Sequence, residues 1–341
     1  MKTITKVLMG VVAISAVGCG NGGSTTASTS GETAPASVDA TKKLEIAVIP
    51  KGATHEYWKS IHEGADKAAA ELGNVDIIWQ GPMKEDDRDG QIKVVEDFIS
   101  KGVNGIVLAP LDDVALANPV KDAQNANIPV VIIDSGLKNV EPVSYVATDN
   151  YKGGSMAADE MVKVLGGKGD IVVLRYQVGS ASTMDREQGF LDEIKKTPAI
   201  HVLSDNQYAG ATVETAQKTS ENMLQPFRNA DGSLKIQGIY APNESSTFGM
   251  LRTLQDNNWA GKVKFIGFDT SAKLLEALTK GEINGLIVQN PRNMGYLGVK
   301  TLVEKIRGGK VEAKIDTGAT LVTKDNMNED SMKELLAPPK N

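Results

Sequence analysis

The stretch LEIAVIPKGATHEYWKSIHEGADKAAAELGNVDIIW (44–79) joins two apolar runs through one amphipathic segment. The runs 44–50 and 75–79 are rich in Ile and Val and have the length of buried strands, whereas residues 57–72 carry apolar side chains at helical spacing. A strand, a helix and a second strand in this order are typical of a parallel βαβ unit. The stretch therefore predicts a parallel sheet covered by helices.

The same alternation continues as far as residue 307. Two sets of about five strands, each with its own helices, predict an α/β protein with two doubly wound lobes. With 341 residues, the chain is long enough for each lobe to bury its own core. The further apolar runs are 104–110, 128–134 and 143–148 in the first set and 170–176, 201–204, 235–240, 262–268 and 284–289 in the second. The further helical stretches are 89–101, 185–196, 212–224, 245–257 and 292–307.

The beginning of the chain predicts export. Lys2 and Lys6 flank the start of an apolar stretch, 7–17, which is too short to span a bilayer as a stable helix. Small residues follow it and lead to Cys19, the only cysteine of the chain, which has no partner for an intramolecular disulfide.

The residues Ala-Val-Gly-Cys at 16–19 resemble a bacterial lipobox, in which the cysteine is lipidated. We therefore expect a lipoprotein signal peptide at 1–18 and lipidation of Cys19. Gly, Ser, Thr and Ala dominate the next residues, so 19–43 is expected to be a flexible linker. An ordinary signal peptide followed by an unrelated cysteine is the alternative.

Charge and composition disfavour several classes of function. The formal net charge is −6 and no cluster of Lys and Arg offsets it, so a nucleic-acid partner is not expected. No Gly-x-Gly-x-x-Gly follows the first strand, and no Walker-type phosphate loop occurs. His55, His62 and His201 are the only histidines, so the parts of a nucleophilic triad are missing. We therefore expect no enzyme, no cofactor and no metal site.

One acidic cluster, EDDRD at 85–89, needs its own interpretation. Its spacing does not match an EF-hand calcium loop. Acidic side chains favour the N-terminus of a helix, and a helix is predicted from residue 89. We therefore interpret the cluster as a solvated acidic loop that leads into this helix.

Polar and aromatic side chains gather where the predicted strands end. In parallel sheets the carboxyl ends of the strands meet at one edge, and ligands bind there. Carboxylates, amides and Arg can bind sugar hydroxyl groups, and aromatic rings can lie against the C–H faces of a sugar. The pattern predicts a site for a polyhydroxylated ligand. The residues concerned are Lys51, His55, Tyr57, Trp58, Asp134, Ser135, Asp185, Arg186, Asn243, Asp269 and Gln289.

Each of these positions also has a purely structural interpretation. Asp134 and Asp269 are suited to cap helix N-termini, and Asn243 is suited to cap the helix that follows it. Tyr57 and Trp58 are suited to the core side of the first helix. The occurrence of all these residues at successive strand ends favours ligand binding.

From residue 44 to about 324 the chain resembles the periplasmic sugar-binding proteins of the ribose-binding type. The motifs GVNGIVLAPLD, NIPVVIIDS, VATDNYKGG, REQGF, NESSTFGMLRTLQ, FIGFD and VQNP occur in the order and spacing of that family. The resemblance implies two Rossmann-like lobes joined by a three-segment hinge, the periplasmic binding protein type I fold. It implies a first lobe of 44–148 and 289–318, a second lobe of 149–288 and 319–325, and a C-terminal tail of 326–341.

The resemblance also implies ligand contacts. Ribose binders have an arginine at the position of Ser135, a serine at that of Lys51 and an asparagine at that of His55. Lys51, the pair Asp134-Ser135 and the acid Asp185 are instead similar to binders of rhamnose and of the furanosyl quorum signal autoinducer-2. A pentose, a deoxyhexose, a polyol and a sugar-derived signal all remain as ligands. The family contacts fall on Tyr57, Trp58, Asp134, Arg186, Asn243, Asp269 and Gln289.

These features predict the solute-binding component of an ABC-type importer, which binds a small monosaccharide or sugar-like ligand and delivers it to a permease. The alternative is a receptor for a sugar-derived signal, of the autoinducer-2 or chemotaxis type. A regulator of the lactose-repressor type shares the fold but begins with a helix-turn-helix, where this chain has an export signal. We expect an exported monomer in the periplasm or at the cell surface, attached to the membrane by its lipid.

Overall fold

The apolar runs of the first set form a six-stranded sheet in the computed structural model, which describes residues 42–340. Its strands are β1 (Leu44–Ile49), β2 (Val75–Trp79), β3 (Gly105–Leu108), β4 (Val130–Ile133), β5 (Ser144–Ala147) and β11 (Lys314–Asp316). Their order is β11-β5-β4-β3-β1-β2, and every neighbouring pair is parallel. All carboxyl ends therefore lie along one edge.

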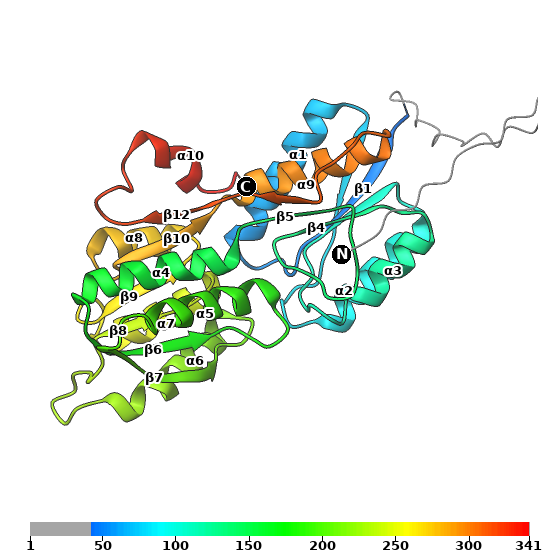
Figure 1. The fold of residues 1–341 in the computed structure, drawn as a ribbon. Coiled ribbons are helices and arrows are strands. Elements are labelled where there is room, and N and C mark those ends of the chain that lie inside the picture. The colour runs from blue at the N-terminus through cyan, green and yellow to red at the C-terminus, as the bar shows by residue number, and fades with distance from the viewer. Residues whose placement is uncertain (1–41, 341) are drawn as a thin grey trace, which may run out of the picture. The chain divides into compact units, whose positions relative to one another are not determined.

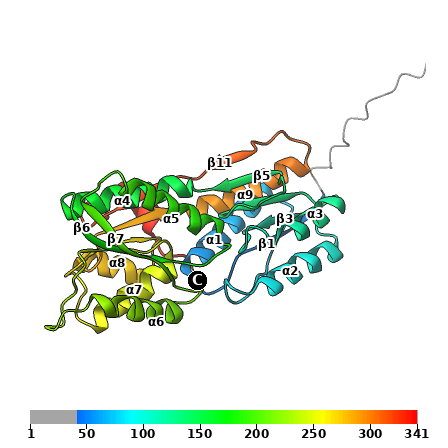
Figure 2. The same ribbon diagram turned by 60° about the horizontal axis from the view of Figure 1, so that its bottom comes forward.

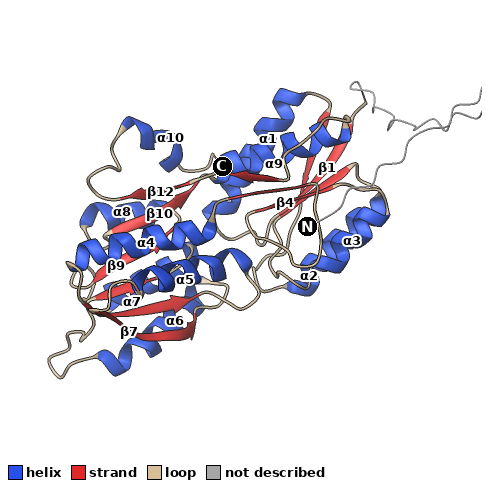
Figure 3. Cartoon of the chain, in the orientation of Figure 1, coloured by secondary structure: helices blue, strands red, loops and turns tan. Residues whose placement is uncertain are grey.

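Helices cover both faces of this sheet (Figure 1, Figure 3). Ile46 and Val48 of β1 share one core with α1 (Glu56–Leu72) and α9 (Pro291–Ile306). Ala47 and Ile49 share another core with α2 (Arg88–Lys101) and α3 (Ala117–Asn125). This alternation follows from the two-residue period of a strand. We call the sheet and these helices the first lobe.

The second set of runs forms a second six-stranded sheet, with one antiparallel edge strand. Its strands are β6 (Gly169–Arg175), β7 (Ile200–Tyr208), β8 (Gly238–Tyr240), β9 (Lys264–Phe268), β10 (Gly285–Gln289) and β12 (Ala319–Val322). Their order is β12-β10-β9-β8-β6-β7, and only the pair of β10 and β12 is antiparallel.

Helices cover both faces of the second sheet as well (Figure 3). One core contains residues of α4 (Asn150–Leu165) and α5 (Ala181–Ile194), and the other contains residues of α6 (Val213–Leu224), α7 (Glu244–Asp256) and α8 (Ala272–Lys280). We call this sheet and these helices the second lobe. Two doubly wound α/β lobes are therefore confirmed as the fold.

Reciprocal glycines set the packing of helix pairs in both lobes. A Cβ added at Gly64 of α1 or Gly295 of α9 would come within 1.9 or 2.1 Å of a backbone oxygen of the facing helix. The same holds at 2.0 Å for Gly154 of α4 and Gly189 of α5. Each pair therefore crosses backbone to backbone, as Figure 2 shows for α4 beside α5. Any side chain at these four positions would force the helices apart.

The chain passes between the sheets three times. The passages lie between β5 and α4, between β10 and α9, and between β11 and β12. Thr148 lies at the first passage and Gly318 at the third, and Thr148 Oγ1 donates to the carbonyl of Gly318 at 3.1 Å. This hydrogen bond ties the two crossing segments together. All described residues belong to one compact unit.

The last described residues continue beyond β12 with a 3₁₀ turn (Asp330–Met332) and α10 (Lys333–Leu336). Met327, Met332, Leu335 and Leu336 pack against a core of the second lobe. At the other end, the predicted signal peptide, Cys19 and the linker up to residue 41 lie outside the described residues. Within residues 42–340, no helix is long and apolar enough to cross a membrane.

Candidate functional site

Side chains from both lobes enclose one polar cavity beyond the carboxyl ends of the strands. Nine of the eleven residues predicted from the sequence line it, and the cavity leaves about 20 Å³ of free space because these side chains bond to one another. We call it the polar cavity. Its lining residues are Lys51, His55, Tyr57, Trp58, Glu85, Asp134, Ser180, Ser182, Thr183, Arg186, Asn243, Glu244, Asp269 and Gln289.

Lys51 and Asp134 form a buried ion pair in the first lobe. Lys51 follows β1 and Asp134 follows β4, and Lys51 Nζ lies 2.8 Å from Asp134 Oδ2. The same ammonium group donates to the hydroxyls of Ser182 and Ser180 in the second lobe, at 3.1 and 3.4 Å. A buried cation requires such partners, since an unpaired one would be strongly destabilising. Lys51 therefore connects the two lobes across the cavity.

Glu85 binds three groups at once, although its sequence neighbours suggested a solvated loop. It accepts hydrogen bonds from Trp58 Nε1 and from the hydroxyl of Tyr176, both at 2.7 Å, and His55 Nδ1 lies 3.0 Å away. The interpretation as a solvated acid was wrong for Glu85, which is buried because these partners surround it. The prediction that the cluster leads into a helix is confirmed, because Asp87 caps the N-terminus of α2.

The His55–Glu85 contact is an ion pair. Burial alone lowers the pKa of His55, but the charge of Glu85 and its hydrogen bond raise it to about 9. Burial alone would raise the pKa of Glu85, but the charge of His55 outweighs this effect and lowers the pKa to about 2. At neutral pH the imidazole is therefore protonated, and its Nε2 is a buried donor with no partner among the described residues.

Tyr57 and Trp58 serve both as core residues and as cavity walls. Both rings belong to the core under α1, and they meet edge to face with centroids 4.9 Å apart. Tyr57 Oη donates to Asp134 Oδ1 at 2.9 Å. Burial and the nearby carboxylates raise the pKa of Tyr57, so this hydroxyl stays a donor.

Arg186 supplies the donor fork of the second lobe. Its side chain is 2% exposed, and its guanidinium lies 4.0 Å from the centre of the Phe268 ring. Nε donates to Asn150 Oδ1 at 2.8 Å and Nη1 donates to the carbonyl of Pro242 at 3.0 Å. Nη2 has no partner among the described residues, so it is free to bind an acceptor in the cavity.

Asp269 and Gln289 form a further part of the cavity wall. Gln289 Nε2 donates to Asp269 Oδ1 at 2.7 Å, and the backbone N–H of Glu244 donates to Asp269 Oδ2 at 3.1 Å. The Arg186 guanidinium is 3.9 Å away, which is too far for a tight ion pair. Burial raises the pKa of Asp269, with Arg186 opposing it.

Asp134, Asp269 and Asn243 were each suited to cap the helix that follows them, and only Asn243 does so. Asn243 caps α7, and its Oδ1 accepts from the N–H of Ser246 at 3.2 Å. Its amide nevertheless lines the polar cavity. Asp269 does not cap the helix that follows it, because Ser271 caps α8, although it accepts from the first N–H of α7. Asp134 is followed by β5 rather than by a helix.

Ser135 and Asp185 do not line the polar cavity. Ser135 is buried, and its Oγ accepts from the N–H of Ser182 at 3.0 Å, which ties the lobes together beside the cavity. Asp185 precedes Arg186 on α5 and is exposed. Adjacent residues of a helix point about 100° apart, so the two side chains cannot both face the cavity.

Glu244 is the clearest residue that the sequence analysis missed. Helix α1 has no side-chain cap of its own, and Glu244 of the second lobe supplies one by accepting from the N–H groups of Tyr57 and Glu56, at 3.1 and 3.3 Å. Burial raises the pKa of Glu244 to about 7, against the charge of His55. Glu244 lies just before the helix predicted from residue 245, and nothing in the sequence indicated its partner in α1.

The polar cavity is suited to a small neutral ligand with several hydroxyl groups. It offers carboxylates and amides as acceptors and two cationic donors without partners, while aromatic rings line one side. Within residues 42–340, no cluster of His, Cys, Asp and Glu has the arrangement of a metal site.

A family model described as periplasmic binding protein domain matches residues 46–310. The chain is similar to the ribose import binding protein of Escherichia coli, with 30% identity over 85% of this chain and 94% of that protein. It is also similar to the D-allose-binding periplasmic protein of the same organism, with 28% identity over 81% of this chain and 88% of that protein.

Two solved structures are similar over nearly the whole described chain. A carbohydrate transporter solute-binding protein of Agrobacterium radiobacter, in complex with D-arabinose, has a TM-score of 0.81 and 36% identity, covering 87% of this chain and all of that one. An ABC transporter solute-binding protein of Agrobacterium vitis, with bound D-fucose, has the same score and identity and covers 86% of this chain.

Proposed function

The chain belongs to the periplasmic binding protein family, and we propose that it binds a small neutral monosaccharide in the polar cavity and delivers it to the permease of an ABC-type importer. Its relatives are named for the import or binding of ribose and allose, and similar structures hold D-arabinose and D-fucose. These names support nutrient uptake over a receptor for a sugar-derived signal. No step of catalysis is part of the proposal.

The observation that carries this proposal is the pair of buried donors without partners. Arg186 Nη2 and His55 Nε2 are both buried, and an unsatisfied buried donor is costly unless a ligand completes it. Sugar hydroxyls and ring oxygens provide acceptors at such positions, and they donate in turn to carboxylates. We infer that Asp134, Asn243 and Asp269 accept from the sugar, as the resemblance to ribose-type binders also implies.

The aromatic and cationic side chains of the first lobe complete the proposed site. We infer that Trp58 or Tyr57 packs on the C–H face of the sugar ring. Lys51 occupies one side of the polar cavity as a cation held by Asp134, and a sugar hydroxyl is a suitable acceptor for it. In this proposal Lys51, where ribose binders have a serine, selects among sugars.

We propose that the three passages between the sheets act as a hinge and that the ligand favours the closed state. The hydrogen bonds of Lys51 with Ser182, of Glu85 with Tyr176 and of Glu244 with α1 all join one lobe to the other. Opening would break them together. Small-angle scattering should show a smaller radius of gyration with sugar than without it.

We further propose that the protein is exported and anchored through lipidated Cys19. The relatives are periplasmic binding proteins, and the lipobox-like residues before Cys19 support the anchor. Wild-type protein should enter the detergent phase in phase separation, and Cys19→Ser protein should stay in the aqueous phase. Partition of the variant with detergent would contradict the anchor.

The binding proposal is tested by calorimetric titration of purified protein with D-ribose, D-allose, D-arabinose and D-fucose. We expect at least one of them to bind with a Kd of about 10 μM or tighter, and to be recovered unchanged after release. The variant Arg186→Lys keeps the charge but loses the planar fork, so it should weaken binding about tenfold or more. Lys195→Arg, at the exposed C-cap of α5, is the control, and it should bind as wild type does. Absence of binding across this panel would contradict the proposal.

A further inference from the structure

The residues after β12 touch both lobes. We call residues 326–340 the C-terminal segment. Its apolar side chains, including Leu335 and Leu336, pack against a core of the second lobe. Its backbone is held by Arg292 of α9 in the first lobe, whose Nη2 donates to the carbonyls of Ala337 and Pro338 at 2.7 and 2.9 Å. The segment therefore forms a wall along one side of the space between the lobes.

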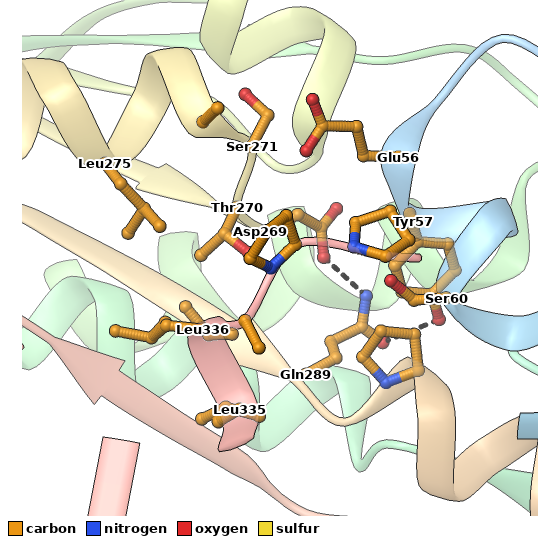
Figure 4. A pocket seen from close by; sticks show the side chains of 16 residues that line it. Glu56, Tyr57, Ser60, Asp269, Thr270, Ser271, Leu275, Gln289, Leu335 and Leu336 are labelled. Carbon is orange, nitrogen blue, oxygen red and sulfur yellow. Dashed lines mark hydrogen bonds between the residues drawn. The ribbon is translucent and has the colours of Figure 1, made fainter. Parts of the chain in front are cut away.

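A second cavity, of about 210 Å³, lies between this wall, α8 and the start of α1 (Figure 4). Figure 4 shows Leu275, Leu335 and Leu336 on one side of it and the hydrogen-bonded pair of Asp269 and Gln289 on the other. Three prolines also line it. We call this space the apolar compartment. The prolines are Pro291, Pro338 and Pro339.

The apolar compartment adjoins the polar cavity. Tyr57, Asp269 and Gln289 line both spaces, so only side chains separate them. The polar cavity leaves about 20 Å³ free, whereas the apolar compartment is about ten times larger. A ligand bound by Asp269 and Gln289 therefore has room to extend in one direction, past these two side chains.

The lining of the apolar compartment indicates what it can accept. Most of its exposed surface is apolar, from leucine, valine and proline side chains that cannot satisfy hydroxyl groups, whereas Glu56, Ser60, Thr270 and Ser271 add a smaller polar part. A second sugar ring would therefore leave some of its hydroxyl groups unpaired there. An apolar cavity of about 150 Å³ holds a benzene molecule in another protein. The compartment therefore suits an apolar group of the size of a phenyl ring or a short alkyl chain.

We propose that the ligand is a monosaccharide derivative with an apolar substituent, such as an aryl or alkyl glycoside, whose sugar lies in the polar cavity and whose substituent lies in the apolar compartment. This inference rests on the proposed sugar-binding function. It assigns a binding role to the C-terminal segment, which closes the compartment through Leu335 and Leu336.

The test compares methyl and phenyl glycosides of D-arabinose and D-fucose, in both anomeric forms, by calorimetric titration. With wild-type protein, one phenyl glycoside should bind at least about tenfold more tightly than the corresponding methyl glycoside, because the ring leaves water. Leu336→Trp and Leu275→Trp fill the compartment from two different elements. Each should remove the phenyl preference and leave binding of the methyl glycoside unchanged.

Two controls and one further variant keep the result interpretable. Leu203→Trp adds the same ring at an exposed position on β7 and should keep the phenyl preference. A chain that ends at Glu329 loses the wall and should also lose the preference. Melting curves establish that each variant is folded.

The outcomes separate the two proposals. If free sugars and methyl glycosides bind but phenyl glycosides do not bind more tightly, the apolar compartment is not a ligand site and the proposed function stands. If Leu336→Trp and Leu275→Trp both still bind the phenyl glycoside more tightly than the methyl glycoside, the apolar compartment is likewise not a ligand site and the proposed function stands. If neither the sugars nor any glycoside binds, the proposed function fails, and this inference fails with it.

Discussion

Asp134 in the first lobe and Asp269 in the second occupy equivalent places. Each follows the third strand in the order of its sheet, β4 or β9. Each has a positive φ, 63° and 65°, and among the described residues the other non-glycine residues with positive φ are all asparagines. The N–H of Asp134 donates to Val146 of the next strand at 3.2 Å, and that of Asp269 donates to Ile287 at 2.8 Å. The backbone is therefore the same in both lobes.

The surroundings of the two carboxylates differ. Asp134 has the ammonium group of Lys51 at 2.8 Å, inside its own lobe. Asp269 has an amide, Gln289, at 2.7 Å and only a distant guanidinium, that of Arg186 at 3.9 Å. One acid is thus neutralised by a close cation, whereas the other is stabilised by dipoles and keeps a raised pKa.

This difference shows that backbone position and chemical role are set separately. A carboxylate on a strained turn at a strand end is a feature of both lobes, and such strain is concentrated at functional sites. Which partner the carboxylate meets depends on side chains that come from other elements. We therefore expect Asp134 to matter for folding and binding together, and Asp269 to matter for binding alone.

The largest effect is expected for Asp134→Asn. Asn tolerates positive φ and can still accept from Tyr57, but Lys51 would keep a buried charge without a counter-ion. The free energy of unfolding should fall by about 3–5 kcal/mol in urea titrations. The control Asp76→Asn removes an acid whose ion pair with Lys43 is exposed on both sides, so it should cost at most about 1 kcal/mol. Equal losses in both variants would contradict the comparison.

The double variant Lys51→Met/Asp134→Asn sharpens this prediction. Replacing both members of a buried ion pair is often neutral for stability, because no unpaired charge remains. The free energy of unfolding should return to within about 1 kcal/mol of wild type. Sugar affinity should stay at least about a hundredfold weaker, because both groups line the polar cavity. Recovery of affinity together with stability would show that neither residue binds the ligand.

A smaller effect is expected for Asp269→Asn. Asn can accept from Gln289 and from the N–H of Glu244, and it tolerates the positive φ. Stability should therefore change by less than about 1 kcal/mol, whereas sugar affinity should fall about ten- to a hundredfold, since the stronger acceptor is lost. Calorimetric titration and melting curves of the same sample measure both. A loss of stability without a loss of affinity would indicate a structural role.

The sequence predicted the architecture because apolar runs of the length of a buried strand recur along it. All ten apolar runs named from the sequence form strands. The run 201–204 extends to residue 208 as β7, whose polar end is tolerated because β7 is the edge strand of its sheet. The three residues of β11 gave no signal, because Lys-Ile-Asp carries only one apolar side chain.

The site was predictable as far as it follows from strand ends. Asp134, Asn243 and Asp269 were found in this way. Glu85 was not, since its neighbours Asp86 and Asp87 are exposed and only the fold brings Tyr176, 91 residues away, to its carboxylate. Tertiary partners of this kind leave no mark in the local sequence.

A further effect is expected from pH, and it should arise in the second lobe. Glu244 reaches the N-terminus of α1 only when the lobes meet, and burial then raises its pKa to about 7 from an ordinary value near 4.5. The closed state therefore binds the proton more tightly than the open state does. Sugar affinity should be constant below about pH 4.5 and fall as the pH rises towards 7, by up to roughly a hundredfold.

The first lobe should contribute little to this pH dependence. His55 and Glu85 belong to the same lobe, so their ion pair should survive opening. Of the groups that raise the pKa of His55 to about 9, only the smaller contributions of Glu244 and Asp269 should then be lost. Glu244→Gln should therefore flatten the affinity profile between pH 5 and 8, because Gln can accept from the same N–H groups without titrating. Titrations of wild type and variant at several pH values decide the point. If the variant keeps the full slope, the dependence comes from His55 or Asp269, the other titratable groups around Glu244, and opening disturbs the first lobe as well.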